Sequence, residues 1–275
     1  MLFRSQDGRI LFRGDYHLLA MANLCLSTAE RVLVQLGSFP AYNFEELFQG
    51  MKKLPLEEWI GKDDAFPVKG HALDSKLHSV PDCQSILKKA AVERLRQKYQ
   101  TSWFSESGAV HQIQFSIRKN IATIYLDSSG VGLHKRGYRA NGNDAPLRET
   151  LAAAMVTLTR YRGREFLWDP FCGSGTIPIE AAMIAKNKAP GAFRRFSAEA
   201  FAWIDPKVWG QVRADAKDRE FHGAYRIMGS DNDPKCVSLA MANARKAGLG
   251  DLIDFRDGDA TKMSLPSDSG ILVCN

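Results

Sequence analysis

The stretch EFLWDPFCGSGTIPIEAAMIA, at residues 165–185, places an apolar strand, a glycine-rich loop and an apolar helix in direct succession. Beyond this stretch, further strands alternate with a helix. The elements predicted there are strands at 225–230, 252–256 and 270–274 and a helix at 234–247. Such alternation is typical of a parallel sheet with helices packed on it. This feature limits the second half of the chain to an α/β fold with a doubly wound sheet.

The ends of the helix at 234–247 are well specified. Asp233 can accept a hydrogen bond from a first-turn amide, and Pro234 suits the first turn because no N–H is needed there. Gly248 can close the helix in a left-handed conformation. Another helix is expected ahead of the glycine loop, at 147–161. Its apolar residues on one face are Leu147, Leu151, Met155 and Leu158.

The first half of the chain has a different pattern, in which helices and strands form a compact α+β unit. The predicted strands are at 8–14, 32–39 and 66–73, with two more at 111–127 that turn at Lys119 and Asn120. The predicted helices are at 15–32, 43–54 and 79–99, and Asn43 is a candidate N-cap. The buried stripe of the third helix is Leu87, Ala91, Leu95 and Tyr99. Lys88, Lys89 and Arg96 fall outside that stripe.

Composition excludes several classes of protein. The chain of 275 residues is 45% hydrophobic and 25% charged, which is ordinary for a globular protein. No apolar run approaches the roughly 18 residues that would cross a bilayer, and charged residues interrupt the first twenty positions. The five cysteines lack any C-x-x-C spacing, and the six histidines lack ligand spacing. We therefore expect a cytoplasmic protein without disulfides, bound metal or membrane segment.

Positive charge is concentrated in one half of the chain. Nineteen of the 37 basic residues, but only fourteen of the 31 acidic ones, lie in residues 1–140. The segment 128–146 is rich in Gly, Ser and Asn, as expected at a domain boundary, and carries Lys135, Arg136 and Arg139 with Tyr138 between them. It can be a polar linker, or its cations can hold phosphate while Tyr138 stacks on a base.

The glycine loop lies where ligands bind in parallel sheets, beyond the carboxyl end of a strand. A dinucleotide site would need a third glycine at Pro178, and a P-loop would need Lys after Gly175, where Thr176 stands. Asp169 precedes the loop and suits a cationic group, while free amides at the helix start suit an anion. S-adenosylmethionine (SAM) has both kinds of charge. The predicted contacts in this loop are Asp169, Phe171, Cys172, Gly173, Ser174, Gly175 and Thr176.

Acidic residues also end the next two predicted strands. Asp231, followed by Asn232, can accept hydrogen bonds from both hydroxyls of a ribose. Asp259 can bind the amino group of adenine, and Ala260 can offer its backbone amide. A surface turn at Asp257 and Gly258 explains part of the second motif equally well.

The ordered segments LRETLAAAM (147–155), DPFCGSGTIPIEAAMIA (169–185), GSDNDP (229–234) and DGDA (257–260) resemble the class I SAM-dependent methyltransferases that modify amino groups. SVPDCQ (79–84) and LDSSGVGLHKRGYR (126–139) resemble the RNA methyltransferases that contain a THUMP domain. The most similar family methylates the 2-amino group of a guanine in bacterial large-subunit (23S) ribosomal RNA. This resemblance implies an α/β Rossmann-like methyltransferase sheet preceded by an α+β THUMP-like domain. The cofactor it implies is SAM.

The resemblance also implies domain boundaries. They are the remnant of a small ferredoxin-like unit at 1–32, a THUMP-like domain at 33–130, a basic linker at 131–146 and a methyltransferase domain at 147–275. The residues expected to bind RNA are Lys88, Lys89, Lys135, Arg136 and Arg139. Charge reversal at the last two should then weaken RNA binding and reduce its dependence on salt.

Asn275 aligns with the first residue of the Asn/Asp-Pro-Pro-aromatic motif in that family. An exocyclic amine is a poor nucleophile because its lone pair is delocalised into the ring. The amide oxygen of Asn275 could accept an N–H bond and redirect the lone pair, so that catalysis would come from orientation and electrostatics. The sequence reaches only four of the seven strands of the class I sheet. We therefore interpret it as a fragment truncated at both ends, with weak SAM binding and no turnover.

Two other functions are compatible with these patterns. A DNA adenine amino-methyltransferase would share the chemistry of Asn275, although the basic α+β half favours RNA. The chain could also be an RNA-binding module whose methyltransferase domain is inactive.

Overall fold

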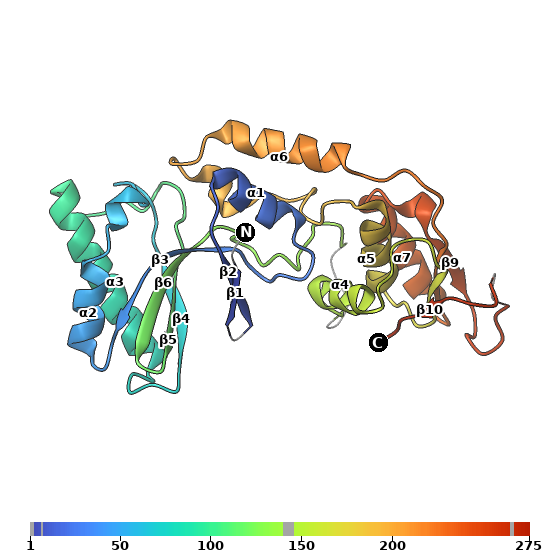
Figure 1. Ribbon diagram of the computed structural model, residues 1–275, viewed down its shortest axis with the longest axis horizontal. Coiled ribbons are helices and arrows are strands. Elements are labelled where there is room, and N and C mark those ends of the chain that lie inside the picture. Colours follow the sequence, from blue (N-terminus) through green and yellow to red (C-terminus); the bar gives the residue numbers. More distant parts are fainter. Residues whose placement is uncertain (1–2, 7, 140–145, 265–266) are drawn as a thin grey trace. The chain divides into compact units, whose positions relative to one another are not determined.

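The computed structural model describes residues 3–6, 8–139, 146–264 and 267–275, and the chain in it forms two compact units. The parallel-sheet unit comprises Met1–Glu30, Gly132–Arg195 and Lys207–Asn275. The mixed-sheet unit comprises Arg31–Val131 and Phe196–Pro206. Figure 1 labels elements of both units where there is room. No helix among the described residues has the length and apolar character that a membrane span requires.

The parallel-sheet unit is built on four strands in the order β10-β7-β8-β9, and every neighbouring pair is parallel. These strands are β7 (Leu167–Asp169), β8 (Ile227–Asp231), β9 (Asp254–Asp257) and β10 (Ile271–Leu272). The helices that follow or precede them are α4 (Glu149–Leu158), α5 (Thr176–Lys186), α6 (Pro206–Asp218) and α7 (Pro234–Lys246), with a short 3-10 helix, η3 (Gly250–Leu252). The predicted α/β fold is confirmed. Because all strands run the same way, the loops after β7, β8, β9 and β10 meet at one edge of the sheet.

The core of this unit lies between the sheet, α5 and α7. Its buried residues include Ile177, Ile179, Ala182, Ile227, Ala244 and Val273.

Asp233 caps α7 by accepting a hydrogen bond from Lys235 N at 2.8 Å, and Gly248 has a positive φ of 64° at the far end, both as predicted.

The buried face of α4 differs from the prediction. Leu151 and Leu158 are 53% and 83% exposed, whereas Ala152, Ala153 and Val156 are buried. The reason is that α4 packs against α5, and small side chains allow two helices to approach closely. The apolar spacing in the sequence identified the helix correctly. Of the four residues on its predicted apolar face, Leu147 and Met155 pack against the core, whereas Leu151 and Leu158 are exposed.

Helix α6 was missed by the sequence analysis. Its signals are Pro206 at the first position and the pair Trp209 and Val212, which are three residues apart and both buried.

The N-terminal segment of the parallel-sheet unit is a hairpin followed by a helix. Strands β1 (Phe3–Gln6) and β2 (Arg9–Phe12) pair antiparallel, and α1 (Tyr16–Cys25) begins after its N-cap Asp15. The predicted helix at 15–32 is too long, because the backbone is already extended at Leu26.

The mixed-sheet unit has strands in the order β3-β6-β5-β4. They are β3 (Leu33–Pro40), β4 (Val68–Leu73), β5 (Ile113–Arg118) and β6 (Ile121–Asp127), of which β4 and β5 are parallel and the other pairs antiparallel. Helices α2 (Phe44–Lys52) and α3 (Val80–Tyr99) pack against each other, and a 3-10 helix, η1 (Leu56–Glu58), lies between α2 and β4 in the chain. The turn between β5 and β6 is at Lys119 and Asn120, as predicted, with φ values of 50° and 60°.

Local signals in this unit also hold. Asn43 caps α2 by accepting a hydrogen bond from Glu46 N at 2.9 Å. Leu87, Ala91 and Leu95 are fully buried on α3, as the periodicity predicts.

One short segment packs in a different unit from the residues that flank it in the sequence. Phe196–Pro206, which contains the 3-10 helix η2 (Ser197–Ala200), packs into the mixed-sheet unit, although the chain before and after it belongs to the parallel-sheet unit. Phe201 stacks on His111 with ring centroids 4.2 Å apart, and Trp203 meets Trp59 edge-on at 5.0 Å. This segment lies within the predicted methyltransferase domain, 147–275, whose boundaries stay a prediction.

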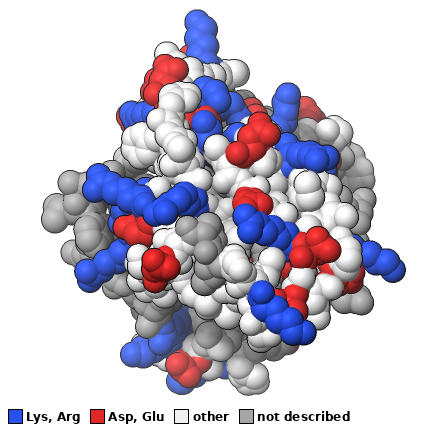
Figure 2. All heavy atoms as spheres, turned by 90° about the vertical axis from the view of Figure 1, so that its right-hand side faces the viewer, with Lys and Arg blue, Asp and Glu red and all other residues white. Residues whose placement is uncertain are grey.

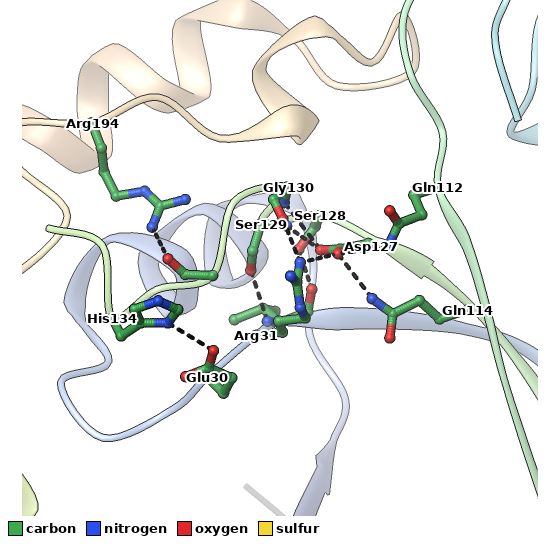
Figure 3. Close-up of polar contacts among 12 residues, drawn as sticks. Glu30, Arg31, Gln112, Gln114, Asp127, Ser128, Ser129, Gly130, His134 and Arg194 are labelled. Carbon is green, nitrogen blue, oxygen red and sulfur yellow. Dashed lines mark hydrogen bonds and ion pairs between the residues drawn. The ribbon is translucent and has the colours of Figure 1, made fainter. Parts of the chain in front are cut away.

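A buried carboxylate organises the end of β6 in the mixed-sheet unit (Figure 3). Asp127 is fully buried and accepts hydrogen bonds from Ser129 N at 2.9 Å, Gly130 N at 3.1 Å and Gln114 Nε2 at 2.9 Å, and it pairs with Arg31. A buried charge is tolerated only when it is paired and hydrogen-bonded, and Asp127 satisfies both conditions. The network holds the chain where it enters β3 against the chain where it leaves β6.

Candidate functional site: a pocket at the carboxyl edge of the parallel sheet

A pocket of about 240 Å³ opens in the parallel-sheet unit at the carboxyl ends of β7 and β10. Its lining residues are Pro146, Leu147, Asp169, Phe171, Cys172, Gly173, Ser174, Thr176, Ile177 and Asn275. Six of the seven predicted loop residues and the predicted catalytic Asn275 are therefore brought together. Pro146, Leu147 and Ile177 were not predicted as site residues. Leu147 had been assigned to the apolar face of the predicted helix at 147–161.

The glycine loop has the backbone that the two glycines were expected to allow. Gly173 and Gly175 have positive φ values of 51° and 81°. A Cβ on Gly175 would lie 2.8 Å from the Cβ of Ala240 on α7, so this residue permits close packing of loop and helix and does not line the pocket. A Cβ on Gly173 would meet nothing within 4 Å, so its position leaves space open.

Asp169 is the buried charge of the pocket. It is 1% exposed, and its Oδ1 accepts a hydrogen bond from Phe171 N at 3.1 Å. Burial is the main cause that raises the pKa of Asp169 to about 7; the hydrogen bond from Phe171 opposes this shift, and the nearby charge of Asp231 adds to it. A cation in the pocket would favour the ionised form.

Asp231 connects three loops at the same edge of the sheet. Its Oδ2 accepts from Gly173 N at 2.9 Å, its Oδ1 accepts from Asp233 N at 3.0 Å, and its backbone oxygen accepts from Gly258 N at 2.9 Å. Each carboxylate oxygen can accept a further bond, so the side chain can still bind a ligand hydroxyl. Asp231 and the exposed Asn232 do not line the pocket. Their role in holding a nucleoside stays a prediction.

Asp259 is engaged by its own loop. Its Oδ1 accepts from Thr261 N at 2.9 Å and from Thr261 Oγ1 at 2.6 Å, and its Oδ2 lies 3.2 Å from Lys262 Nζ. The bonds from Thr261 lower the pKa of Asp259. Ala260 packs against Phe166, Trp168 and Met228. Neither Asp259 nor Ala260 lines the pocket, so their contact with adenine also stays a prediction.

Arg136 and Tyr138 are buried, so the prediction that they contact RNA is wrong. Arg136 is 1% exposed, and its guanidinium lies 3.2 Å from Glu180 Oε2 and donates to Leu133 O and Ser27 O. Tyr138 is also 1% exposed and donates to Glu180 Oε1 at 3.3 Å. Neither side chain can reach a nucleic acid, because each has its partners inside the parallel-sheet unit. A buried glutamate on α5 attracts this arginine inward, and no local pattern in 128–146 reveals that.

Arg139 is half-buried and also faces inward. Its Nε lies 3.1 Å from Glu149 Oε1, and its Nη2 donates to Thr176 Oγ1 at 2.8 Å and to Leu147 O. These contacts lie at or beside the wall of the pocket, and the role of Arg139 in holding RNA phosphate stays a prediction.

The other predicted RNA contacts lie at the surface. Lys135 and Lys89 are exposed. Lys88 Nζ lies 3.5 Å from the centroid of the Phe66 ring and 2.5 Å from Glu106 Oε1, so part of its charge is offset. Lys88 and Lys89 belong to the mixed-sheet unit and Lys135 to the parallel-sheet unit.

A parallel sheet in the order β10-β7-β8-β9, a glycine loop after β7 and an acidic residue at the end of β8 define a class I methyltransferase domain. The chain matches the RMKL-like methyltransferase domain family over residues 136–275, and we conclude that it belongs to that family. It also matches the THUMP domain over residues 41–127 and the RlmL ferredoxin-like domain over residues 2–33. The resemblance found in the sequence is confirmed for the methyltransferase and THUMP parts.

Individual relatives agree with this family. A protein of Bacillus subtilis named "Putative RNA methyltransferase YpsC" is 43% identical over 272 residues, which is 98% of this chain and 71% of that protein. The crystal structure of a "predicted N6-adenine-specific DNA methylase" from Listeria monocytogenes has a TM-score of 0.95 at 43% identity, covering 99% of this chain and 72% of that one. The structure of "SMU.472, a putative methyltransferase complexed with SAH" has a TM-score of 0.93 at 37% identity, covering 99% and 73%.

The cofactor is SAM, and the pocket fits it. SAH is S-adenosylhomocysteine, the molecule that remains when SAM has given up its methyl group. Asp169 offers a buried carboxylate for the cationic amino group, and the start of α5 offers amides for the carboxylate. SAM supplies a methyl group bonded to a positively charged sulfur, which makes that methyl group reactive towards a nucleophile. The chain itself contributes binding, orientation and exclusion of water.

The pKa of Asp169 predicts how binding depends on pH. The carboxyl must be ionised to pair with an amino cation, and its pKa near 7 leaves about a tenth of it ionised at pH 6 and about nine tenths at pH 8. Affinity should therefore increase with pH, and SAH should bind about tenfold more tightly at pH 8 than at pH 6. Titration calorimetry with SAH across this range measures the effect. In Asp169→Asn the affinity should be weaker and independent of pH; an unchanged slope in that variant would assign the titration to another group.

Proposed function

We propose that the protein transfers a methyl group from SAM to the exocyclic amino group of a guanine in large-subunit ribosomal RNA. The observation that carries the proposal is that Asn275, at the end of the segment after β10, lines the same pocket as Asp169 and the glycine loop. An amide oxygen that can orient an amine therefore lies beside the residues that hold the cofactor. The target nucleotide rests on the family resemblance.

Asn275 would act on the amine and not on the cofactor. Its side-chain oxygen can accept one N–H bond from the exocyclic amino group, which holds the nitrogen in place and turns its lone pair towards the methyl carbon. Phe171, which is 62% exposed and also lines the pocket, offers an aromatic face on which an unstacked base can rest. Enzymes that modify a base must take it out of its stack, so an exposed ring beside the catalytic amide is suited to this reaction.

The RNA part of the proposal is supported by the THUMP match and by the name of the Bacillus relative. The distribution of charge on the surface restricts where RNA can bind. Figure 2 shows the side of the molecule on the right in Figure 1, and basic and acidic side chains are interspersed among its described residues. A continuous basic field is what phosphate binding favours, and the described residues on this face do not show one. The exposed cations Lys89 and Lys135 are the best remaining candidates.

Charge reversal tests these two lysines. Lys89→Glu and Lys135→Glu should each weaken RNA binding, and each should reduce the slope of log affinity against log salt by about 1, because one phosphate contact is lost. Lys262→Glu, at a side chain that is 82% exposed on the parallel-sheet unit, is the matched control and should leave the slope unchanged. Filter binding of a ribosomal RNA fragment at several salt concentrations gives the slopes. Equal slopes in all three variants would remove both lysines from the RNA surface.

A DNA adenine amino-methyltransferase is the second candidate, and the name of the Listeria structure favours it. The same amide chemistry serves the amino group of adenine. Labelled SAM offered with ribosomal RNA that lacks modifications or with duplex DNA separates the two, and digestion to nucleosides identifies the product. Label in 2-methylguanosine supports the proposal. Label in N6-methyladenine of DNA would replace it.

A further inference from the structure

We propose that Arg139 is a positioning residue for the amino-acid end of SAM, and that it acts through the hydroxyl of Thr176. The inference rests on SAM as the cofactor of this pocket and is independent of which nucleic acid is methylated. The sequence pattern assigned Arg139 to RNA, whereas two of its side-chain partners in the structure, Thr176 and Leu147, line the pocket.

Arg139 lies behind the pocket wall and forms hydrogen bonds with residues that line the pocket. Nη2 donates to Thr176 Oγ1 at 2.8 Å and to the backbone oxygen of Leu147, and both of these residues line the pocket. Nε lies 3.1 Å from Glu149 Oε1, whose side chain is 4% exposed. Arg139 itself does not line the pocket. The guanidinium therefore ties together three points, at Leu147, Glu149 and the first residue of α5.

The bond to Thr176 determines what its hydroxyl can do. A guanidinium has donors and no acceptor, so Thr176 Oγ1 must accept from Arg139. The hydroxyl hydrogen is then left to be donated elsewhere. Among the contacts of the described residues, the other hydroxyl recorded near it is Ser174 Oγ, at 3.4 Å, which is long for such a bond. An anionic acceptor inside the pocket would receive this hydrogen well.

The start of α5 favours the same kind of ligand. Among the described residues, no side chain caps this helix, whose N-cap is Gly175, so its first amides have no side-chain acceptor. A helix N-terminus attracts anions and disfavours a nearby cation such as Arg139. Glu149 offsets part of that cost. A carboxylate bound at the start of α5 would complete the balance of charge, and the only carboxylate of SAM is on its amino-acid end.

Two ligands separate this role from a general effect on the pocket. SAH carries the amino-acid end, whereas 5′-methylthioadenosine has the same adenosine and sulfur without it. Titration calorimetry of both ligands with Arg139→Met and Thr176→Val should show SAH binding about tenfold more weakly, which is about 1.4 kcal/mol, and methylthioadenosine binding unchanged. Arg139→Lys keeps the charge and one donor and should recover part of the loss. Lys217→Met removes a cation of the same unit whose side chain is 69% exposed, and it should change neither affinity.

The double variant tests the route through Thr176. If Arg139 acts by orienting that hydroxyl, Arg139→Met combined with Thr176→Val should bind SAH no more weakly than Thr176→Val alone. Additive losses would overturn the proposal. Equal losses for SAH and methylthioadenosine would also overturn it, because the pocket as a whole would then have been distorted. If Arg139→Met does not fold, Arg139→Lys, which keeps a cation beside Glu149, takes its place in the double variant with Thr176→Val. Failure of the unaltered protein to bind SAH would contradict the cofactor assignment itself.

Discussion

Replacing Glu180 with alanine should lower the free energy of unfolding by about 3–5 kcal/mol, the cost of leaving a buried charge without its partner. Glu180 is fully buried on α5, and Arg136 Nε and Nη2 lie 3.3 and 3.2 Å from its two carboxylate oxygens. Tyr138 donates to the same carboxylate at 3.3 Å. Burial raises the pKa of Glu180, and the guanidinium of Arg136 opposes that shift. Urea unfolding followed by circular dichroism measures the change.

Two control variants make the test of Glu180 specific. Arg256→Ala breaks the ion pair with Asp254, in which both side chains are about half exposed, and should cost less than about 1 kcal/mol. Replacing both members of the buried pair, with Arg136→Met and Glu180→Leu together, should restore most of the stability, because no charge is left buried. A loss in Glu180→Ala no larger than that in Arg256→Ala would mean that the pair is hydrated in solution.

The second large effect is expected at Asn275. In a chain that carries the whole motif begun by Asn275, Asn275→Ala should reduce methyl transfer on the order of 10³-fold, since a group that orients the nucleophile and stabilises its developing charge contributes about that much. SAH affinity should change little, because the amide is proposed to bind the amine and not the cofactor. Transfer of labelled methyl groups to ribosomal RNA gives the rate, and calorimetry gives the affinity.

Asn275→Asp is the matched variant for this position. An aspartate keeps an acceptor oxygen in the same place, so it should retain part of the activity that alanine loses. Equal activity in the alanine variant and the unaltered protein would remove Asn275 from the catalytic site. RNA binding that persists while methyl transfer is absent in every variant, including the unaltered protein, would instead support the inactive RNA-binding module.

Much of the fold could be predicted because its signals are local. The strand, glycine loop and helix at 165–185, the caps Asn43 and Asp233 and the turn at Lys119 and Asn120 all depend on residues close together in the sequence. The site followed from topology, since strands that run parallel bring their following loops to one edge. Asp169 and Asn275 are more than one hundred positions apart and still share a pocket.

Two of the failures have a common cause, which is a partner distant in the sequence. Arg136 and Lys135 are adjacent and both cationic, yet one is buried and the other exposed because Glu180 lies under the first. The buried face of α4 was chosen by its small residues facing α5 and not by its leucines. In each case the type of side chain is compatible with either burial or exposure. The residue that packs against it in the fold determines which of the two occurs.

Because Phe196–Pro206 packs into the mixed-sheet unit, the gene segments that encode the two units cannot be separated at a single point. A gene segment that encodes residues 31–131 alone would lack Phe201 and Trp203, and would leave His111 and Trp59 without the rings that cover them. A segment that encodes the parallel-sheet unit would in turn carry a strip of aromatic residues with nothing to pack on. Recombination at a single boundary would therefore damage both products, so the two units should be inherited together.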